Sequence, residues 1–494
     1  MSITGIGSRS ALMAQSLVEM RRQLDDLQRQ LGTGQKSDTY AGVGLNRGLA
    51  VGLRARLSAL EGYNNAIANV GVRLDIAQSS LTRLSDIGRD VKAAAFQSVN
   101  IESSGTTIAQ SIASSGLGEM LGLLNTQVGD RYIFSGRASD QPAVASLEHI
   151  MDGDGARAGF RQVVAERKLA DLGDGLGRLV VSAPTTTSVM VAEDDDPSVF
   201  GFKLSGINSG LANSTVTGPS GTPPSVTVDL TGQPNDGETV QLWLDLPDGS
   251  SETIILSATT STTPGPHQFT IGANADATAA NLQGALTAAI GERARTALTA
   301  ASAVAAADNF FNGMPQRVDG PPFDTATALI AGTAADTVSW YIGEDGPDPA
   351  RGTATARVDT SIAVSYGMRA NEEGVRWIVQ NVATLAVMTF PPGDPDAKAR
   401  SNALNQRVGV NLDVPVGTQT VEDIASELAA AQSTRVAASE RHRQTDSTLA
   451  GMLQQIEGVS TEEVAAHILA LQVRLQASLQ TTSLLYETSL VNYI

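Results

Sequence analysis

Both ends of the chain carry hydrophobic residues at the spacing of a heptad repeat, and this pattern constrains the fold more than any other feature. Near the N-terminus apolar residues recur at intervals of three and four, at Leu17, Met20, Leu24, Leu27 and Leu31. Near the C-terminus the same spacing joins Val464, Ile468, Leu471 and Leu475, and the chain closes with the apolar residues Leu485, Leu490 and Ile494. Such long, narrow apolar stripes do not stabilise isolated helices, so we expect each stripe to pack against a partner helix.

The pattern stops at LGTGQKSDTYAG (residues 31–42) and resumes from Leu49 to Val91. Two further helices are predicted at residues 375–388 and 421–453, the second rich in Ala and Gln. Near the C-terminus, the segment GVSTEEV (residues 458–464) predicts a helix start, with Ser460 or Thr461 as the cap and Glu463 at capping-box spacing.

The middle of the chain differs in kind. Residues 206–230 have the Gly, Pro, Ser and Thr content of a linker. The segment VQLWLDLPDGSSETIIL (residues 240–256) alternates apolar and polar residues around a Pro-Asp-Gly-Ser turn, which predicts a β-hairpin. A short strand at 267–271 and a helix at 276–290 follow. The segments 338–343 and 355–366 predict a small sheet beside residues 132–134.

We therefore predict a mainly α protein: a long antiparallel helical coiled-coil bundle formed by the N- and C-terminal segments, with a strand-rich section and an inserted α+β outer domain. The predicted order is an N-terminal coiled-coil helix (1–40), a helical rod with a hairpin region (41–205) and the inserted domain (206–314). A strand-rich section (315–366), returning rod helices (367–450) and a C-terminal coiled-coil helix (451–494) complete it.

Composition excludes several classes of function. The net charge of −18, with only 34 basic residues, argues against nucleic acid or an anionic membrane as a partner. The chain has no cysteine, which excludes disulfides and thiol chemistry. No segment approaches the roughly 20 apolar residues of a membrane span, and the N-terminus lacks the pattern of a cleaved signal peptide.

The candidate chemical motifs are weak. GTGQKS lacks the spacing of a phosphate-binding loop and follows a helix instead of a strand. The acidic segments at 152–155 and 193–197 lack the full calcium-loop pattern, which favours solvated loops. The four histidines form no metal-binding pair, and no G-x-S-x-G motif occurs. We expect no enzyme activity, cofactor or metal.

Several segments resemble the bacterial flagellin family. LGTGQKSDTYAG is similar to the L-S-T-G-K-x…D-x-x-A-G segment that follows the first flagellin helix, although Tyr40 departs from the usual pattern. GDRYIFSGRASDQPAV (residues 129–144), YGMRANEEGVRWIVQNVATLA (residues 366–386) and the C-terminal segment from residue 456 look most like the hook–filament junction protein, hook-associated protein 3. The resemblance covers roughly residues 1–144 and 366–494.

This resemblance implies a structural subunit of the flagellum, secreted without a cleaved signal peptide and self-assembling by its terminal helices, which form the inner tube. The implied partners are further copies of the chain, hook-associated proteins, flagellin and an export chaperone. The assembly residues are expected to be the terminal apolar residues named above, and Gly32, Gly34, Asp38 and Gly42 the connector between tube layers. A filament-forming flagellin is the alternative, and a secreted adhesin or enzyme acting through the insert is a third hypothesis.

Overall fold

The computed structural model describes residues 4–194 and 197–491, with side chains described for residues 11–194 and 197–484. The chain divides into two compact units. Unit 1 contains residues 1–71, 356–364 and 433–494, and unit 2 contains residues 72–355 and 365–432. The long helices α2 (Arg47–Ala95) and α10 (Val421–Glu457) each run from one unit into the other.

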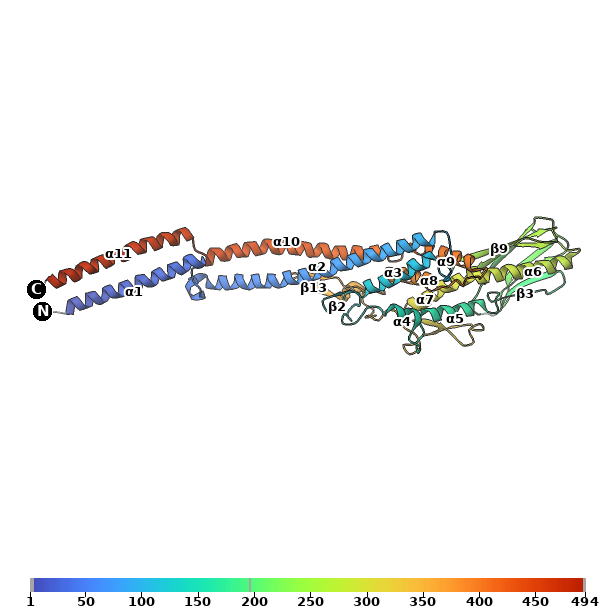
Figure 1. Cartoon of the computed structure of the whole chain (residues 1–494), viewed down its shortest axis with the longest axis horizontal. Coiled ribbons are helices and arrows are strands. Elements are labelled where there is room, and N and C mark those ends of the chain that lie inside the picture. Colours follow the sequence, from blue (N-terminus) through green and yellow to red (C-terminus); the bar gives the residue numbers. More distant parts are fainter. Residues whose placement is uncertain (1–3, 195–196, 492–494) are drawn as a thin grey trace. The chain divides into compact units, whose positions relative to one another are not determined.

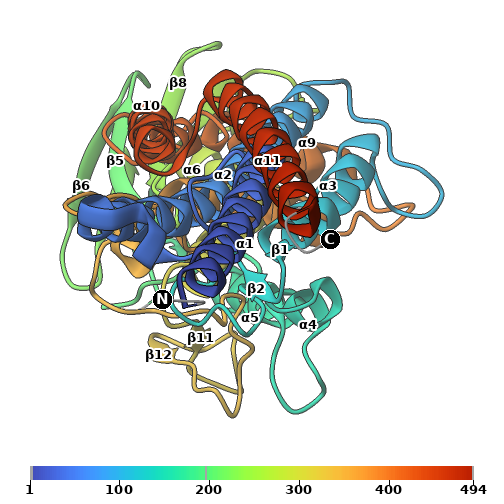
Figure 2. The ribbon, with the colours of Figure 1, turned by 90° about the vertical axis from the view of Figure 1, so that its left-hand side faces the viewer.

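Unit 1 is built from paired helices. Helix α1 (Thr4–Thr33) lies along α11 (Thr461–Val491), as Figures 1 and 2 both show. The first part of α2 lies beside the last part of α10, where Tyr63 contacts the ring of His442. A hairpin of β13 (Thr355–Arg357) and β14 (Ala363–Ser365) carries Asp359, whose carboxylate lies 3.6 Å from His442 Nε2.

The predicted fold class is wrong. About 52% of the chain is helical and several small sheets are present. Among the described residues, the long continuous coiled coil expected at the termini is not evident. Glycine explains the interruption, because Gly34 adopts a φ of +68° and ends α1, while the short helix η1 (Tyr40–Asn46) contains Gly44, also at +68°. Helix α10 ends at Glu457, and the next residue, Gly458, forms a bridge with Gln35 just after the end of α1, so both helices end at the same level.

The helices of unit 2 pack around a core rich in alanine and aromatic residues. Helix α3 (Ile108–Leu124) packs on α8 (Glu373–Val387), and α5 (Phe160–Leu172) packs on α7 (Thr299–Phe311). The short α4 (Leu147–Asp152), the π segment η2 (Ala294–Leu298) and α9 (Ala397–Asn411) complete this part. Phe160, Phe310, Phe311 and Trp340 are buried in successive ring contacts, so aromatic side chains are few but concentrated.

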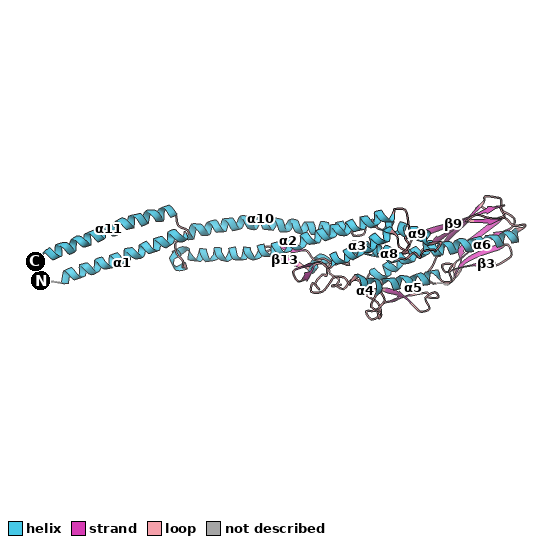
Figure 3. Cartoon of the chain, viewed as in Figure 1, coloured by secondary structure: helices cyan, strands magenta, loops and turns pink. Residues whose placement is uncertain are grey.

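Two four-stranded sheets form the β part of unit 2, and Figure 3 shows them beside α6. The first has the order β3-β4-β7-β6, with β3 (Leu179–Ser182), β4 (Ser188–Glu193), β7 (Ser225–Leu230) and β6 (Ser214–Ser220). The second has the order β10-β9-β8-β5, with β10 (Gln268–Thr270), β9 (Ser251–Thr259), β8 (Thr239–Asp245) and β5 (Lys203–Ser209). Both sheets and α6 (Ala275–Arg293) share one hydrophobic core, which includes Val191, Val226, Leu242, Ile254 and Leu286.

Local predictions in this part had mixed outcomes. The hairpin at 240–256 is confirmed as β8 and β9, which pair from Thr239–Ser257 to Asp245–Ser251, and the strand and helix that follow are confirmed as β10 and α6. The linker predicted at 206–230 is wrong, because β5, β6 and β7 occupy this range. Val226, Val228 and Leu230 alternate into the core, while Ser and Thr fill the other face of the strand. The strands of these sheets begin at Leu179, before the range 206–314.

The strand-rich section has little regular structure. It holds the pair β11 (Gln316–Val318) and β12 (Leu329–Ala331), the short helix η3 (Ala350–Thr353) and the hairpin of β13 and β14. Residues 338–343 contribute one isolated bridge, from Tyr341 to Val144, instead of the predicted strand. A further small pair, β1 (Gln127–Val128) and β2 (Arg131–Tyr132), lies in the segment 129–144 and just before it.

Candidate functional site

The predicted assembly residues lie along the contact between α1 and α11. In α1 the least exposed positions follow the predicted spacing, with Leu17, Met20, Leu24 and Leu27 partly buried and Leu31 40% exposed. In α11 the matching positions are more enclosed: Val464, Ile468 and Leu471 are buried and Leu475 is partly buried. The side chains of Leu485 and Leu490, and the whole of Ile494, lie outside the described residues.

The connector joins the two helix pairs of unit 1 through backbone hydrogen bonds. Gln35 forms an antiparallel bridge with Gly458, Lys36 N donates to Glu457 O at 2.7 Å, and Val459 N donates to Gly34 O at 3.1 Å. Gly32 still belongs to α1, whereas Gly34 has left it. Residues 34–36 therefore pair with residues 457–459 and hold the end of α1 beside the end of α10.

Side chains of the connector add further contacts to this backbone pairing. Lys36 Nζ donates to the carbonyl oxygen of Ile456 at 2.8 Å, next to the carbonyls that end α10. Asp38 lies 3.3 Å from Arg29 of α1. Gly42 packs against Ser37 so closely that a Cβ atom would collide with the serine hydroxyl, which explains a glycine here.

Arg54 and Glu457 form an ion pair that sequence reasoning missed. Arg54 Nη2 lies 2.6 Å from Glu457 Oε2, and the Glu457 side chain is only 10% exposed. The hydrogen bond that Arg54 donates to Glu457 raises the pKa of Arg54. The Arg54 guanidinium also lies 5.4 Å from the ring centre of Tyr40. Because 403 residues separate Arg54 from Glu457, no local pattern could have indicated the pair.

Unit 1 exposes an unusual amount of apolar surface. Half of the exposed large hydrophobic side chains of the described residues lie in unit 1, which holds fewer than a third of the residues of the chain. On α11, Leu469 and Val473 are 63% and 64% exposed and lie one turn apart, opposite the buried stripe. Scattered apolar residues are normal on a soluble protein, but a concentration of them indicates a contact surface.

The two internal segments that carry the family resemblance meet in unit 2. Ser135 forms an antiparallel bridge with Arg369, Gly136 N donates to Met368 O at 3.0 Å, and Ala370 N donates to Phe134 O at 2.8 Å. These contacts place the segments 129–144 and 366–386 side by side although more than 200 residues lie between them.

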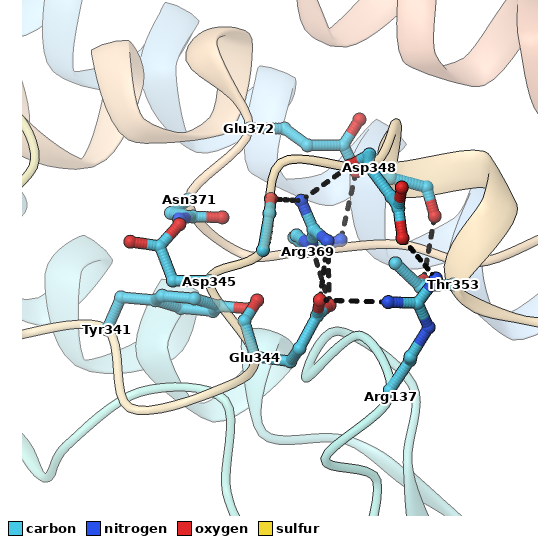
Figure 4. A network of polar contacts seen from close by, with 11 residues as sticks. Arg137, Tyr341, Glu344, Asp345, Asp348, Thr353, Arg369, Asn371 and Glu372 are labelled. Atoms are coloured by element: carbon cyan, nitrogen blue, oxygen red, sulfur yellow. Dashed lines mark hydrogen bonds and ion pairs between the residues drawn. The ribbon is translucent and has the colours of Figure 1, made fainter.

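A charged network surrounds this contact, and Figure 4 shows Arg369 and Arg137 converging on Glu344. Arg369 is 7% exposed, holds both carboxylate oxygens of Glu344 and donates to the carbonyl oxygens of Gly346 and Asp348 at 2.9 Å. Burial raises the pKa of the Glu372 carboxyl, while its ion pair with Arg351 opposes this shift. Every donor of the Arg369 guanidinium has an acceptor, so the network fixes the backbone of both segments.

The motifs that were weighed as metal or catalytic sites have internal partners. Among the described residues, no three His, Asp or Glu side chains lie together as metal ligands. In the acidic loop at 152–155, Asp154 accepts hydrogen bonds from Arg157, which lower the pKa of Asp154 to about 2, and lies 3.4 Å from His149. His267 lies 3.7 Å from Glu292. Ser460 is confirmed as a helix cap, since its hydroxyl accepts from Glu463 N at 3.3 Å.

Comparisons with known proteins assign no family to this chain. Models of known protein families do not match the sequence, and a search of curated proteins finds no match either. None of the described helices is both long enough and apolar enough to cross a membrane.

Proposed function

We propose that this protein is a structural subunit of the bacterial flagellum that self-assembles through its terminal helices, and that its place is the hook–filament junction. It acts outside the cell as part of this assembly, and it has no enzyme activity. Its partners are further copies of itself, hook-associated proteins and flagellin, with a chaperone during export. The filament-forming flagellin is the alternative, and an adhesin or enzyme acting through the β part of unit 2 is less favoured.

The apolar surface of unit 1 is the observation that carries the proposal. Leu469 and Val473 face away from the seam between α1 and α11, so that seam does not bury them. Burial of such a side chain against a neighbouring subunit contributes about 1.5–3 kcal/mol. A contact that joins different faces of identical chains propagates along a tube or fibre instead of closing as a dimer.

The contact between segments 129–144 and 366–386 favours the junction protein over the filament-forming flagellin. Both segments resemble that protein in sequence, and they pack against each other through Ser135 and Arg369. Two chance resemblances would have no reason to lie side by side in the structure. Two segments inherited from one protein with the same fold would be expected to do so. The copy number distinguishes the two flagellar roles: a junction protein is present in a few copies per flagellum, and a filament protein in thousands.

The test replaces Leu469 and Val473 together by glutamine, which removes apolar surface without adding charge. We expect the variant to keep its helical circular dichroism, to remain monomeric in sedimentation and to be missing from isolated flagella. The matched control is Leu469→Met with Val473→Ile, which keeps the apolar area and should assemble as the parent protein does. Assembly of the glutamine variant at the parent level would refute a role for this face.

A further inference from the structure

A cleft in unit 2 collects positive charge in a strongly acidic protein. It lies between the segment 129–139, the segment 353–355 with 366–368, and Arg73 of α2, and its volume is about 360 Å³. Three arginines line it, Arg73, Arg131 and Arg137, whereas no Asp, Glu or Lys does. Volumes of roughly 300–1,000 Å³ are typical of sites for small molecules.

Two of these three arginines have no acidic partner. Arg137 pairs with Asp348 and approaches Glu344 at 3.5 Å, as Figure 4 shows, so its charge is balanced. Among the described residues, no carboxylate oxygen lies within 4.0 Å of Arg73 or Arg131. The chain has 52 acidic and 34 basic residues, so its net charge is negative. Two guanidinium groups without a carboxylate partner give this cleft the opposite charge.

Neutral hydroxyl groups hold both guanidiniums in place. Arg73 Nη1 donates to Tyr366 Oη at 3.0 Å, and Arg131 Nη1 donates to Ser139 Oγ at 2.9 Å. Each bond uses one of the five N–H groups of an arginine and leaves its charge unchanged. The arginines are thereby oriented while most of their donors stay available for a ligand.

The cleft wall is also closely packed. Gly136, with a φ of +63°, sits in the bridge between the two resemblance segments, and its neighbour Ser135 pairs with Arg369. Gly367 packs against Thr353 and the backbone of Ala354 so closely that a Cβ atom would collide with both. Close packing of the wall favours a site formed in advance, which lowers the entropic cost of binding.

We propose that this cleft binds a small molecule through an oxyanion group, a carboxylate or a phosphate, held by Arg73 and Arg131. Guanidinium groups form paired, charge-assisted hydrogen bonds with such groups. A bound anion also balances the positive charge of the cleft, for which the lining residues offer no carboxylate. The proposal is independent of the flagellar role, because it rests on unit 2 and on no assembly contact.

The test is calorimetric titration of the full chain with three probes at low salt: inorganic phosphate, glucuronate and glucose. We expect saturable binding of phosphate or glucuronate and none of glucose, with affinity falling as salt rises. Tighter binding of glucuronate assigns an organic acid as the ligand, and tighter binding of phosphate assigns a phosphate group.

Variants locate the site. Arg131 is exposed, so Arg131→Gln should fold as the parent does and should weaken binding at least about tenfold, the loss expected for one charged hydrogen bond. Arg73→Gln should act similarly. The matched control Arg89→Gln removes the same charge from a side chain that is 71% exposed on α2, outside the cleft, and should leave binding unchanged. Absence of binding by all probes, or binding that survives loss of both Arg73 and Arg131, would overturn the proposal.

Discussion

Gly32 and Gly34 lie two residues apart at the end of α1 and have different conformations. Gly32 is helical, and nothing lies within 4 Å of the position that a Cβ atom would take. Gly34 has a φ of +68° and donates to Gln30 O at 2.8 Å, which places it in the left-handed turn that ends the helix. The same substitution at these two positions should therefore have opposite effects.

We expect Gly32→Ala to stabilise the last turn of α1 by about 0.5–1 kcal/mol, because alanine favours the helix. Gly34→Ala should destabilise it by about 1 kcal/mol, because an L side chain is strained at positive φ. Amide hydrogen exchange over residues 26–34 measures both, with slower exchange in the first variant and faster exchange in the second. Equal effects of the two substitutions would show that Gly34 does not set the helix end.

The lowered pKa of Asp154 predicts how the stability of the fold depends on pH. The side-chain hydrogen bond from Arg157 is the largest cause of its lowered pKa, which is about 2. Since the folded pKa lies below the unfolded value of about 3.9, Asp154 stabilises the fold above about pH 4, and this stabilisation disappears as pH falls through about 2. Arg157→Gln should raise the pKa of Asp154 toward the unfolded value in a carbon-detected NMR titration, although the backbone N–H of residue 157 still donates to the carboxylate. A parent protein in which Asp154 already titrates there would contradict the ion pair.

At the scale of elements, Arg407 of α9 fastens the turn between β8 and β9. Its Nε lies 2.9 Å from Asp248 Oδ2, and the two side chains are 11% and 4% exposed. Asp248 also accepts from Ser250 N at 3.0 Å, which shapes the Pro-Asp-Gly-Ser turn itself. The helical and β parts of unit 2 therefore share a nearly buried ion pair.

Arg407→Met should lower the free energy of unfolding by about 3 kcal/mol, because it leaves the Asp248 carboxylate buried without its charge partner. Denaturant unfolding followed by tryptophan fluorescence, to which Trp243 in β8 contributes, measures this loss. The control Arg443→Met removes an arginine that is 77% exposed and should change the free energy by less than about 0.5 kcal/mol. Indistinguishable midpoints for the two variants would refute the fastening role.

Periodicity predicted the long elements well. In the predicted stripe of α2, Leu53 and the positions from Ile67 to Leu84 are buried, whereas the positions from Leu57 to Tyr63 are partly buried. Helices α8 and α10 begin and end within a few residues of their predictions. Composition failed at residues 206–230, because Ser and Thr occur both in linkers and on the faces of strands that point away from the core. Only the partner strands, which include β4 with Val191 opposite Val226, decide between the two structures.

At the scale of the molecule, neither the fold class nor the candidate sites could be predicted completely. Heptad spacing indicated that α1 and α11 have a partner, but two left-handed glycines and the connector divide the expected coiled coil. The Arg369 network and the arginine cleft join segments more than 200 residues apart, and pairing at that distance leaves no periodic signal. Local patterns predicted elements, whereas tertiary contacts set the class.

Immunogold labelling of isolated flagella, with antibodies raised against this protein, tests the central claim most directly. We predict a single cluster of gold where the hook meets the filament, corresponding to a few subunits per flagellum. Gold along the whole shaft would contradict the junction position and support the filament-forming alternative. Flagella that carry no gold, from cells in which the protein is present, would contradict a flagellar role altogether.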